Sequence, residues 1–506
     1  MLSNDKDLYV ESEIGTLRKI IIHSPDGGIG KIIPSTFSDN LYDDIVHLKS
    51  MQKEYNHYVK LLLYFLDPQK IKYIKDCEAV NPNQRGNCFI PGKKEYFNSD
   101  KVLEVQHLLE QIVKNEAVKL RLISAVCSYE ESSYEIQQQL EAINDAALLA
   151  KILISGILPK SASSLAEDQY VFPPVPNFIF TRDIGIMIKD HILLSRMATT
   201  ARKRESLITK FLALYFLFKE DVSKVIEVIE ESDFFLYEEQ ERKARFISIE
   251  GGDIMMIHPK HLIVGCSERT SSNAINEIIH TIFSNEKLGI EKISVIKIAK
   301  NRAQMHIDTI FTHVKRNVWV LYGRYSENIV ATENKVKQSY LRQLIHQQDL
   351  IAIEEPEVLQ FYKSADEKYA AEKDYSVNKK LAGIEQLLKE ISIKDYGCKP
   401  EDVKIIYSGG NEFPYDDREQ WTDSCNVVAL KEGVIVGYDR NDFTANAFKQ
   451  NGFNVITTAA LFKKFDEGLN PHSLENTLIL LPSAELSRAR GGPHCMSMPL
   501  LRDKLF

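Results

Sequence analysis

Pairs of short apolar segments recur along the chain, and each pair is followed by an arginine and a helix-like stretch. A polar or acidic residue opens each unit, and a turn separates its two apolar strands. Clear copies begin at Asn177, Glu250, His306 and Asn426, and a weaker copy, TLRKIIIHSPDGG, begins at Thr16. The apolar runs are short, β-branched and bounded by turn residues, which favours buried strands. Any α/β protein can contain such hairpins, but their repetition predicts modules arranged around an axis.

Two regions depart from this repeat. Across residues 43–165 apolar side chains recur every three or four positions, in segments such as VLEVQHLLEQIVKN and YEIQQQLEAINDAALLAKILISGIL. This spacing is typical of amphipathic helices, so we expect a helical insertion there. Residues 333–396 are charged and include KKLAGIEQLLKEISI. We expect them to form a second, mainly helical insertion at the periphery.

Composition narrows the class of protein. The chain has 506 residues, of which 44% are hydrophobic and 26% charged, as in ordinary soluble proteins. Its net charge of -8 comes without a long basic run, so no nucleic-acid surface is expected. The start MLSNDKDLYVESEIG does not resemble a signal peptide, and apolar stretches such as LLLYFL are too short to span a bilayer. We therefore expect a cytoplasmic protein that binds neither nucleic acid nor a membrane.

The cysteines raise a separate question. There are seven, they are scattered, and no CxxC pair occurs. This spacing indicates neither a structural zinc site nor a disulfide framework. An odd number without a signal peptide suits reduced thiols, so one of them is a candidate nucleophile.

Groups that could carry chemistry lie at the start of the repeated units. Asp183 lies in FTRD, Glu250 in IEGGD, and His306 and Asp308 in MHIDT. Cys495 lies in ARGGPHCMSMP, just after the predicted strand NTLILLP. If the modules surround an axis, these openers converge at one end of it. Three carboxylates, a histidine and a cysteine would then share one pocket.

This set of groups suits reactions at a guanidinium carbon. Carboxylates can hold the planar cation through paired hydrogen bonds. The bound cation and His306 would favour the thiolate of Cys495. The thiolate attacks the central carbon, His306 protonates the departing ammonia, and water activated by His306 hydrolyses the thiouronium intermediate. Such chemistry needs no metal and no cofactor.

Each residue also has a simpler interpretation. Cys495 could be a small buried hydrophobe, and His306 a structural histidine. Glu250 and Asp253 could cap a turn beside the glycine pair between them. His306 and Asp308 also resemble metal ligands, although a mononuclear site would need a third ligand nearby. Their coincidence with the repeat is what favours the catalytic interpretation.

Taken together, the motifs resemble those of the bacterial arginine deiminases. They occur in that family's order and extend over nearly the whole chain apart from the insertions. The motifs are PNFIFTRD, IEGGD, CSERTS, MHIDTIF, REQWTDSCNVV and RGGPHCMSMPL. The sequence departs from the family in an extra loop that carries Cys88 and in a longer stretch after His306. Neither departure touches the motifs that carry the candidate catalytic groups.

The resemblance implies a fold and a catalytic set. The fold would be the pentein fold, a fivefold pseudo-symmetric α/β propeller, here a single catalytic domain of residues 1–506 with a helical insertion. Cys495 would be the nucleophile and His306 the general acid and base. Asp183 and Asp308 would bind the guanidinium group, and Glu250 would orient His306 and the substrate.

The resemblance also implies a substrate pocket. Arg202, Arg269 and Arg490 match positions that engage the substrate's α-carboxylate or gate the pocket, and Asn177 and Phe180 match residues that line it. The implied reaction converts free L-arginine to L-citrulline and ammonia without a cofactor. The implied assembly is a homo-oligomer.

Three alternatives remain open at this point. An amidinotransferase would share the covalent intermediate but resolve it with an amine. A deiminase could act on another guanidine, such as agmatine, a methylated arginine or an arginine side chain in a protein. The three pocket arginines disfavour agmatine, which has no carboxylate. An inactive pentein would be expected to have lost a catalytic group, whereas all five groups are present.

Overall fold

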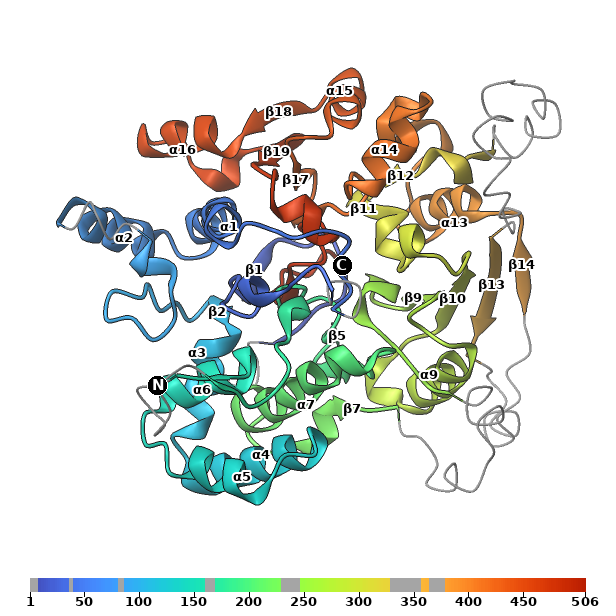
Figure 1. Cartoon of the computed structure of the whole chain (residues 1–506). Coiled ribbons are helices and arrows are strands. Elements are labelled where there is room, and N and C mark those ends of the chain that lie inside the picture. The colour runs from blue at the N-terminus through green and yellow to red at the C-terminus, as the bar shows by residue number, and fades with distance from the viewer. Residues whose placement is uncertain are drawn as a thin grey trace.

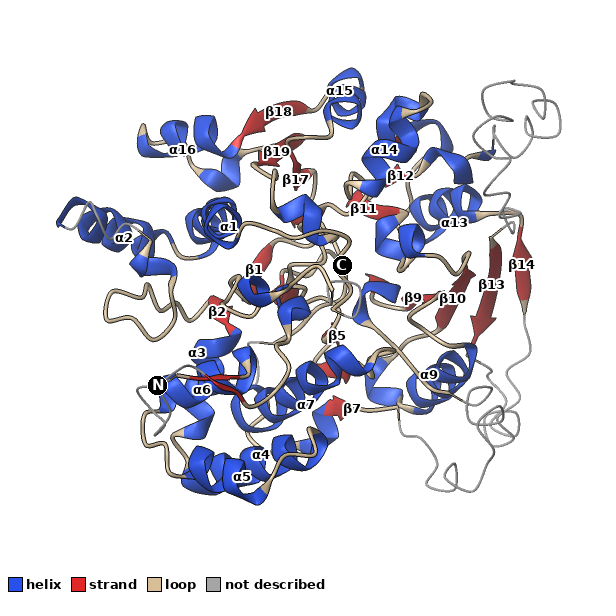
Figure 2. Ribbon diagram, in the orientation of Figure 1, coloured by secondary structure: helices blue, strands red, loops and turns tan. Residues whose placement is uncertain are grey.

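The computed structural model describes residues 8–35, 40–80, 86–159, 169–228, 246–327, 356–363 and 378–506. Helices and strands alternate throughout these ranges, so the predicted α/β class is confirmed. Small sheets lie around the centre of the molecule, and most helices lie outside them (Figures 1 and 2). No helix in the described ranges combines the length and the apolar character required to cross a membrane.

Five sheets within these ranges repeat one pairing pattern. Two strands pair antiparallel, and a third strand pairs parallel to one of them. The repeated strands, sheet by sheet, are β20 (Met498–Arg502), β1 (Leu17–Ile22) and β2 (Val102–Glu104); β5 (Gly185–Ile188), β6 (His191–Leu194) and β7 (Val225–Ile226); β8 (Ile254–His258), β9 (His261–Cys266) and β10 (Lys292–Lys297); β11 (Phe311–Lys315), β12 (Val318–Leu321) and β15 (Lys404–Tyr407); and β16 (Val428–Lys431), β17 (Val434–Tyr438) and β19 (Thr477–Leu481). The repeat seen in the sequence therefore corresponds to a repeated unit of structure.

The first of these sheets joins the two ends of the chain. Strand β1 pairs antiparallel with β20, with Lys19 opposite Leu501 and Ile21 opposite Met498. The fifth repeat looked weak in the sequence because its two antiparallel strands come from opposite ends of the chain. This pairing also holds the segment just before β20, which contains Cys495, at the centre of the molecule.

Several strands of these sheets are buried along their whole length. Every residue of β5, β6, β9 and β17 is buried. Strands covered on both faces lose the alternation of apolar and polar residues, which explains the continuous runs in the sequence. Three further strands extend the sheets, and one separate pair completes the set: β13 (Glu357–Tyr362), β14 (Lys379–Leu381), β18 (Asn454–Thr457), β3 (Ile157–Leu158) and β4 (Gln169–Tyr170).

Helices connect and cover the sheets. Several begin at a side chain that accepts a hydrogen bond from the first turn, as Asp145, Ser271 and Thr457 do. The α-helices are α1 (Leu48–Leu66), α2 (Pro68–Val80), α3 (Val105–Val113), α4 (Glu116–Tyr129), α5 (Tyr134–Glu141), α6 (Ala146–Ser155), α7 (Lys203–Leu212), α9 (Ser272–Ser284), α13 (Ile384–Glu390), α14 (Tyr415–Trp421), α15 (Asp442–Gln450) and α16 (Thr458–Asp466).

The region predicted as a helical insertion, 43–165, contains one strand of the repeated unit. Six helices, α1 to α6, lie in its described part, but Val102–Glu104 is β2, the parallel partner of β1. The sequence VLEVQHLL has helical periodicity throughout, so the strand could not be recognised. Glu104 ends the strand and caps α3 by accepting a hydrogen bond from His107 N. The insertion is therefore interrupted by a strand of the first sheet.

The second predicted insertion, 333–396, is also not simply helical. Its described part holds β13 and β14 before α13, and both strands extend the sheet formed by β8 to β10. The segment EVLQFY is rich in β-formers and finds a free edge at β10. Its buried Gln360 donates a hydrogen bond to Ser294 on β10. Residues 333–355 and 364–377 of this prediction lie outside the described residues.

Candidate active site

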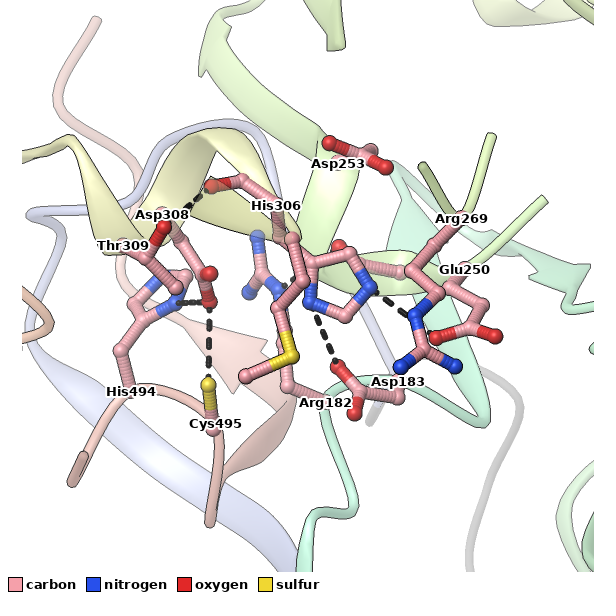
Figure 3. Close-up of polar contacts among 12 residues, drawn as sticks. Arg182, Asp183, Glu250, Asp253, Arg269, His306, Asp308, Thr309, His494 and Cys495 are labelled. Carbon is pink, nitrogen blue, oxygen red and sulfur yellow. Dashed lines mark hydrogen bonds and ion pairs between the residues drawn. The ribbon is translucent and has the colours of Figure 1, made fainter. Parts of the chain in front are cut away.

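Five predicted residues meet where the repeated units begin. Asp183 precedes β5, Glu250 precedes β8, His306 and Asp308 precede β11, and Cys495 precedes β20. Each lies at a corresponding point of its module, which explains why residues distant in sequence come together. Their exposed fractions are at most 4%. The structure thus forms one buried cluster from four modules (Figure 3).

His306 is held among carboxylates. Its Nε2 lies 3.0 Å from Glu250 Oε2, and its Nδ1 lies 3.7 Å from Asp183 Oδ1. Burial by itself would lower the pKa of His306, but the charges of Asp183, Glu250 and Asp253 raise it to about 10. The imidazole is therefore protonated at neutral pH and donates to Glu250. Its other N–H faces the side of the cluster that carries Asp183.

Two glycines make this close approach possible. A Cβ on Gly252 would lie 2.5 Å from His306 Nδ1 and 3.0 Å from Asp183 Oδ1. A Cβ on Gly251 would lie 2.1 Å from the Arg182 carbonyl oxygen. The glycine pair therefore provides space for His306 and its neighbours, in addition to forming the turn that the sequence indicated.

Cys495 has one donor and one acceptor at its sulfur. Asn426 Nδ2 lies 3.1 Å from Sγ, and Asp308 Oδ2 lies 3.4 Å from it. Burial raises the pKa of the Cys495 thiol well above its usual value, and the charges of Asp308, Asp183 and Asp423 raise it further. The sulfur is therefore a neutral thiol that donates to Asp308.

Asp308 is the first member of a chain of side chains, linked by hydrogen bonds and an ion pair, that ends at Arg182. Its Oδ2 lies 2.9 Å from Nδ1 of His494, whose Nε2 lies 3.3 Å from Glu13. Glu13 in turn pairs with Arg182 at 2.7 Å. Burial would raise the pKa of Asp308, but His494 lowers it below its usual value. Asp308 is therefore an ionised carboxylate beside the sulfur.

Sequence reasoning did not assign roles to Asn426, His494, Glu13 or Arg182. Their neighbours in sequence belonged to recognised motifs, but contacts between modules cannot be read from one motif. One signal was available for Asn426. It is the first residue of the fourth repeat, NVVALKEGVIVGYDRN, and so corresponds to the other openers.

Two carboxylate oxygens in the cluster are free to accept hydrogen bonds. Among the described residues, Asp183 Oδ1 and Asp308 Oδ1 have no hydrogen-bond partner, although both atoms are buried. Buried polar atoms are usually paired, so each is expected to meet a donor in a ligand. Asp183 lies beside His306 and Asp308 beside Cys495 (Figure 3). A planar cation between the two carboxylates would lie next to both the His306 ring and the Cys495 sulfur.

Arg202 lies inside the cluster, rather than on a solvated helix surface. Its Nη1 contacts Asp183 Oδ2 at 2.6 Å and lies 3.7 Å from Glu250 Oε2. Its Nε donates to Glu205 at 3.0 Å. Arg202 therefore occupies one oxygen of Asp183 and leaves the other free. The resemblance implied that Arg202 engages the substrate carboxylate or gates the pocket, and its contacts here are with the protein's own acids.

Arg269 is a buried cation with unused donors. Its Nε and Nη1 make no hydrogen bond with any described residue, and its exposed fraction is 3%. Burial would raise the pKa of Glu250, but the hydrogen bond from His306 and the charges of Arg202, His306 and Arg269 together lower it to about 2. The pair of unused N–H groups suits an anionic ligand.

Arg490 packs against an aromatic ring. Its guanidinium carbon lies 3.5 Å from the ring centre of Trp421, a cation–π contact. Its Nη2 lies 3.4 Å from the Arg302 carbonyl oxygen, and its Nη1 lies 3.9 Å from Asp43. Burial lowers the pKa of Arg490. This residue is near the cluster but directed toward Trp421.

The two predicted lining residues support these groups. The Asn177 carbonyl accepts from Arg202 Nη2 at 3.2 Å, and its side chain donates to the Asn40 carbonyl at 2.7 Å. Phe180 is buried, and a Cβ on Gly491 would lie 2.3 Å from its ring. Asn177 therefore links Arg202 to the segment at residue 40, and Phe180 packs under the loop that carries Cys495.

The cluster also has the spacing of a metal site. Asp183, Glu250 and His306 each offer one ligand atom, and these atoms lie within 4.8 Å of one another. A metal needs a neutral imidazole, however, whereas the pKa of His306 is raised to about 10 by carboxylates that outweigh its burial. Arg202 adds a second positive charge beside the same acids. The donor set therefore fits the protonated histidine better than a metal.

Comparisons with known proteins agree with the sequence motifs. The family model described as arginine deiminase matches residues 95–502. The arginine deiminase of Borreliella afzelii is 26% identical over 511 residues, covering 98% of each chain. That of Staphylococcus aureus is 25% identical over 515 residues, covering 99% of this chain and 100% of its own. The resemblance to arginine deiminases is therefore confirmed along almost the full chain.

Solved structures show a more distant similarity. An amidinotransferase of the saxitoxin biosynthetic pathway from Microseira wollei has a TM-score of 0.46 at 11% identity, with 98% of each chain covered. A dimethylarginine dimethylaminohydrolase has a TM-score of 0.33 at 15% identity, covering 64% of this chain and 76% of its own. The assignment of this protein rests on the sequence comparisons and the motifs. The chain belongs to the arginine deiminase family.

Proposed function

We propose that the protein hydrolyses the guanidinium group of free L-arginine to L-citrulline and ammonia through a covalent intermediate on Cys495. One observation carries this proposal. Two buried carboxylate oxygens, Asp183 Oδ1 and Asp308 Oδ1, have no hydrogen-bond partner in the described chain, and they lie beside a thiol and a protonated imidazole. A guanidinium group supplies the donors that both carboxylates need.

Substrate binding would activate the thiol. The resting sulfur is neutral because burial and nearby carboxylates raise the pKa of Cys495. A guanidinium cation between Asp183 and Asp308 compensates those negative charges and lowers the pKa of the thiol. Asp308 Oδ2, which accepts from the thiol at 3.4 Å, is placed to receive its proton. The substrate thus helps to create its own nucleophile.

The first chemical step would release ammonia. The Cys495 thiolate attacks the guanidinium carbon and forms an S–C bond, which gives a tetrahedral intermediate. The C–N bond to a terminal nitrogen then breaks, and that nitrogen leaves as ammonia with a proton from His306. Because Glu250 binds Nε2 of His306, the donor is Nδ1, which faces Asp183.

The second step would consume water. Neutral His306 removes a proton from a water molecule, which attacks the carbon of the thiouronium group. The S–C bond breaks as the hydroxyl proton of the tetrahedral intermediate is lost to solvent, citrulline leaves, and the sulfur takes back from Asp308 the proton that it gave up at the start. His306 returns to its protonated form, so the enzyme ends the cycle as it began. Burial of the cluster would keep amines and other competing nucleophiles away from the intermediate.

Arg269 supports a substrate that carries an anionic end. Its Nε and Nη1 make no hydrogen bond within the described residues, and it is buried beside Glu250. An α-carboxylate would satisfy these donors, whereas agmatine would leave them unpaired. The relatives in Borreliella afzelii and Staphylococcus aureus are named arginine deiminases, which supports the same choice.

The five-sheet architecture supports the pentein assignment. A fivefold pseudo-symmetric propeller requires five equivalent units, and five sheets with one pairing pattern occur in the described chain. The openers of these units supply the catalytic groups. A propeller also explains why the pairing of β1 with β20 is needed, since it joins the ends of the ring.

A product assay tests the proposed reaction. The protein is incubated with L-arginine, and citrulline, ammonia and ornithine are measured with and without added glycine or lysine. Hydrolysis gives equal amounts of citrulline and ammonia whether or not the amine is present. Ornithine formation that depends on the amine would instead indicate an amidinotransferase. Absence of both products would contradict arginine as the substrate.

A further inference from the structure

Asn426 contacts both the sulfur and the backbone of Cys495. Its Nδ2 lies 3.1 Å from Sγ of Cys495, and its Oδ1 accepts from Cys495 N at 3.0 Å. Its Nδ2 also lies 3.1 Å from the carbonyl oxygen of Asp308. One buried carboxamide therefore contacts the reacting sulfur and the backbone of two catalytic residues.

We propose that Asn426 is a catalytic residue, whose side-chain N–H stabilises the Cys495 thiolate and fixes the position of the sulfur. This inference rests on the proposed role of Cys495 as the nucleophile. It assigns the fourth module a part in the chemistry, so that every one of the five repeated units contributes a group to the cluster.

The orientation of the carboxamide follows from its partners. The Cys495 backbone N–H can only donate, so it must face the oxygen of Asn426. The Asp308 carbonyl can only accept, so it must face the nitrogen. A flipped amide would oppose two donors at one end and two acceptors at the other. The N–H that faces Sγ is therefore determined by the backbone.

The sulfur needs such a donor when it loses its proton. Of the two hydrogen-bond partners that the described structure gives Sγ, Asp308 accepts and Asn426 donates. Asp308 repels a thiolate, whereas the Asn426 N–H attracts it. Hydrogen bonds to charged acceptors are stronger than those to neutral ones, so the contact strengthens as the thiolate forms.

The surrounding chain is built around this carboxamide. Asn426 has an exposed fraction of 0%. A Cβ on Gly492 would lie 2.6 Å from the Asn426 carbonyl oxygen and 2.7 Å from its Oδ1. The second glycine of RGGPHC thus allows the loop of Cys495 to approach Asn426. Thr312 holds the same segment from the other side, since its hydroxyl donates to the Cys425 carbonyl at 2.6 Å.

The reactivity of the thiol toward a neutral alkylating reagent tests the proposal. The full-length protein and its variants are treated with iodoacetamide over a range of pH, and modification of Cys495 is followed by peptide mass spectrometry. Asn426→Ala should slow the alkylation of Cys495 about 10- to 100-fold at a pH where the wild-type thiol is mostly protonated. Asn426→Asp keeps the size and the acceptor but places a carboxylate beside Sγ, and should slow it at least as much.

Two controls separate this role from a structural one. Thr312→Val removes a buried hydroxyl from the same segment without touching Sγ, and should leave the Cys495 rate within about threefold of wild type, a difference below about 1 kcal/mol. Cys398, which is partly exposed and whose Sγ lies 3.7 Å from the Arg316 carbonyl oxygen, serves as an internal standard in every sample. Thermal unfolding confirms that each variant is folded.

Two results would overturn the proposal. One is an unchanged rate for Cys495, relative to Cys398, in both Asn426 variants. The other is an equal slowing in Thr312→Val, which would indicate a general effect of the segment. The alkylation needs no turnover of arginine, so failure of the wild type to form citrulline would count against the proposed function and leave the test of Asn426 intact.

Discussion

Glu250 Oε2 lies 3.0 Å from Nε2 of His306, and this contact determines which nitrogen of the ring can act as an acid. With Nε2 bound to a carboxylate, Nδ1 remains on the side of Asp183, 3.7 Å from its Oδ1. Gly252 leaves the space that the ring occupies, because a Cβ there would lie 2.5 Å from Nδ1. The hydrogen bond between Nε2 and Glu250, together with the absence of a side chain at Gly252, thus leaves Nδ1 as the proton donor of the proposed reaction.

The activity should fall on the alkaline side as His306 loses its proton. Burial opposes the charge of His306, but the surrounding carboxylates raise its pKa to about 10. kcat should therefore decrease as the pH rises through about 10, whereas an unperturbed histidine would lose its proton near about 6.5. In Glu250→Gln one of these carboxylates is lost, so the decrease should begin at least about one pH unit lower. A kcat profile that stays flat to about pH 11 would show that His306 is not the acid.

Stability should also decline with increasing pH. For His306, a folded pKa near 10 against an ordinary value of 6.5 means that its contribution is complete below 6.5 and is lost as the pH rises through 10. Burial raises the pKa of Asp253 and Asp423 to about 7, so their contributions are likewise lost as the pH rises through about 7. Glu250 acts oppositely, because its pKa is lowered to about 2, and its contribution is lost only in acid.

Denaturant unfolding at several pH values measures this balance. The free energy of unfolding should decrease steadily between about pH 5 and about pH 9, because Asp253, Asp423 and His306 lose their contributions over this range whereas the contribution of Glu250 is already complete. An increase in the free energy of unfolding between about pH 6 and pH 9 would contradict the charge distribution described for the cluster.

Gly252→Ala should inactivate the enzyme without unfolding it. The added Cβ would lie 2.5 Å from His306 Nδ1, so the ring must move away from the position from which it donates its proton. We expect kcat to fall at least about 100-fold, because small displacements of an acid are costly, with a loss of about 1–3 kcal/mol of stability. Gly27→Ala is the matched control, since a Cβ at Gly27 meets no atom within 4 Å. Equal activities of the two variants would contradict the proposed packing.

The choice of substrate should depend on Arg269. Wild type should prefer arginine over agmatine by at least about a hundredfold in kcat/KM, or roughly 2.7 kcal/mol. Arg269→Ala should reduce this preference mainly by impairing arginine, because the buried donors meet the α-carboxylate. Arg488→Ala, which removes a partly exposed arginine paired with Asp44, should leave the preference unchanged. Equal kcat/KM values of the wild type for the two substrates would contradict the proposal that arginine is its specific substrate.

The sequence predicted the candidate cluster better than it predicted the connections around it. Asp183, Glu250, His306, Asp308 and Cys495 lie in motifs whose residue types and order are local properties, and the structure brings them together. Their convergence could be inferred because each occupies the same place in a repeated unit. The inference needed no knowledge of packing.

The remaining features depend on contacts that no local pattern contains. Strand β2, at Val102–Glu104, lies in helical periodicity and becomes a strand only because β1 offers it an edge. Strand β13 likewise forms because β10 is free to pair. Arg202 was expected to engage the substrate carboxylate or to gate the pocket, and its contacts with the buried acids Asp183 and Glu205 could not be read from its motif. Asn426 begins a repeated unit as the other cluster residues do, but an asparagine considered without its partners does not indicate a role in the chemistry.

The most direct test of the account is the covalent state of Cys495 during turnover of L-arginine. Wild-type protein is mixed with arginine, quenched in acid within the first turnovers, digested and analysed by mass spectrometry, with Cys495→Ser treated in parallel. We predict an adduct on Cys495 with the mass of arginine minus ammonia, formation of citrulline by the wild type, and neither in Cys495→Ser, because an unactivated hydroxyl is a poor nucleophile. Citrulline formation by Cys495→Ser, or the same adduct on Cys266 in place of Cys495, would contradict the central claim.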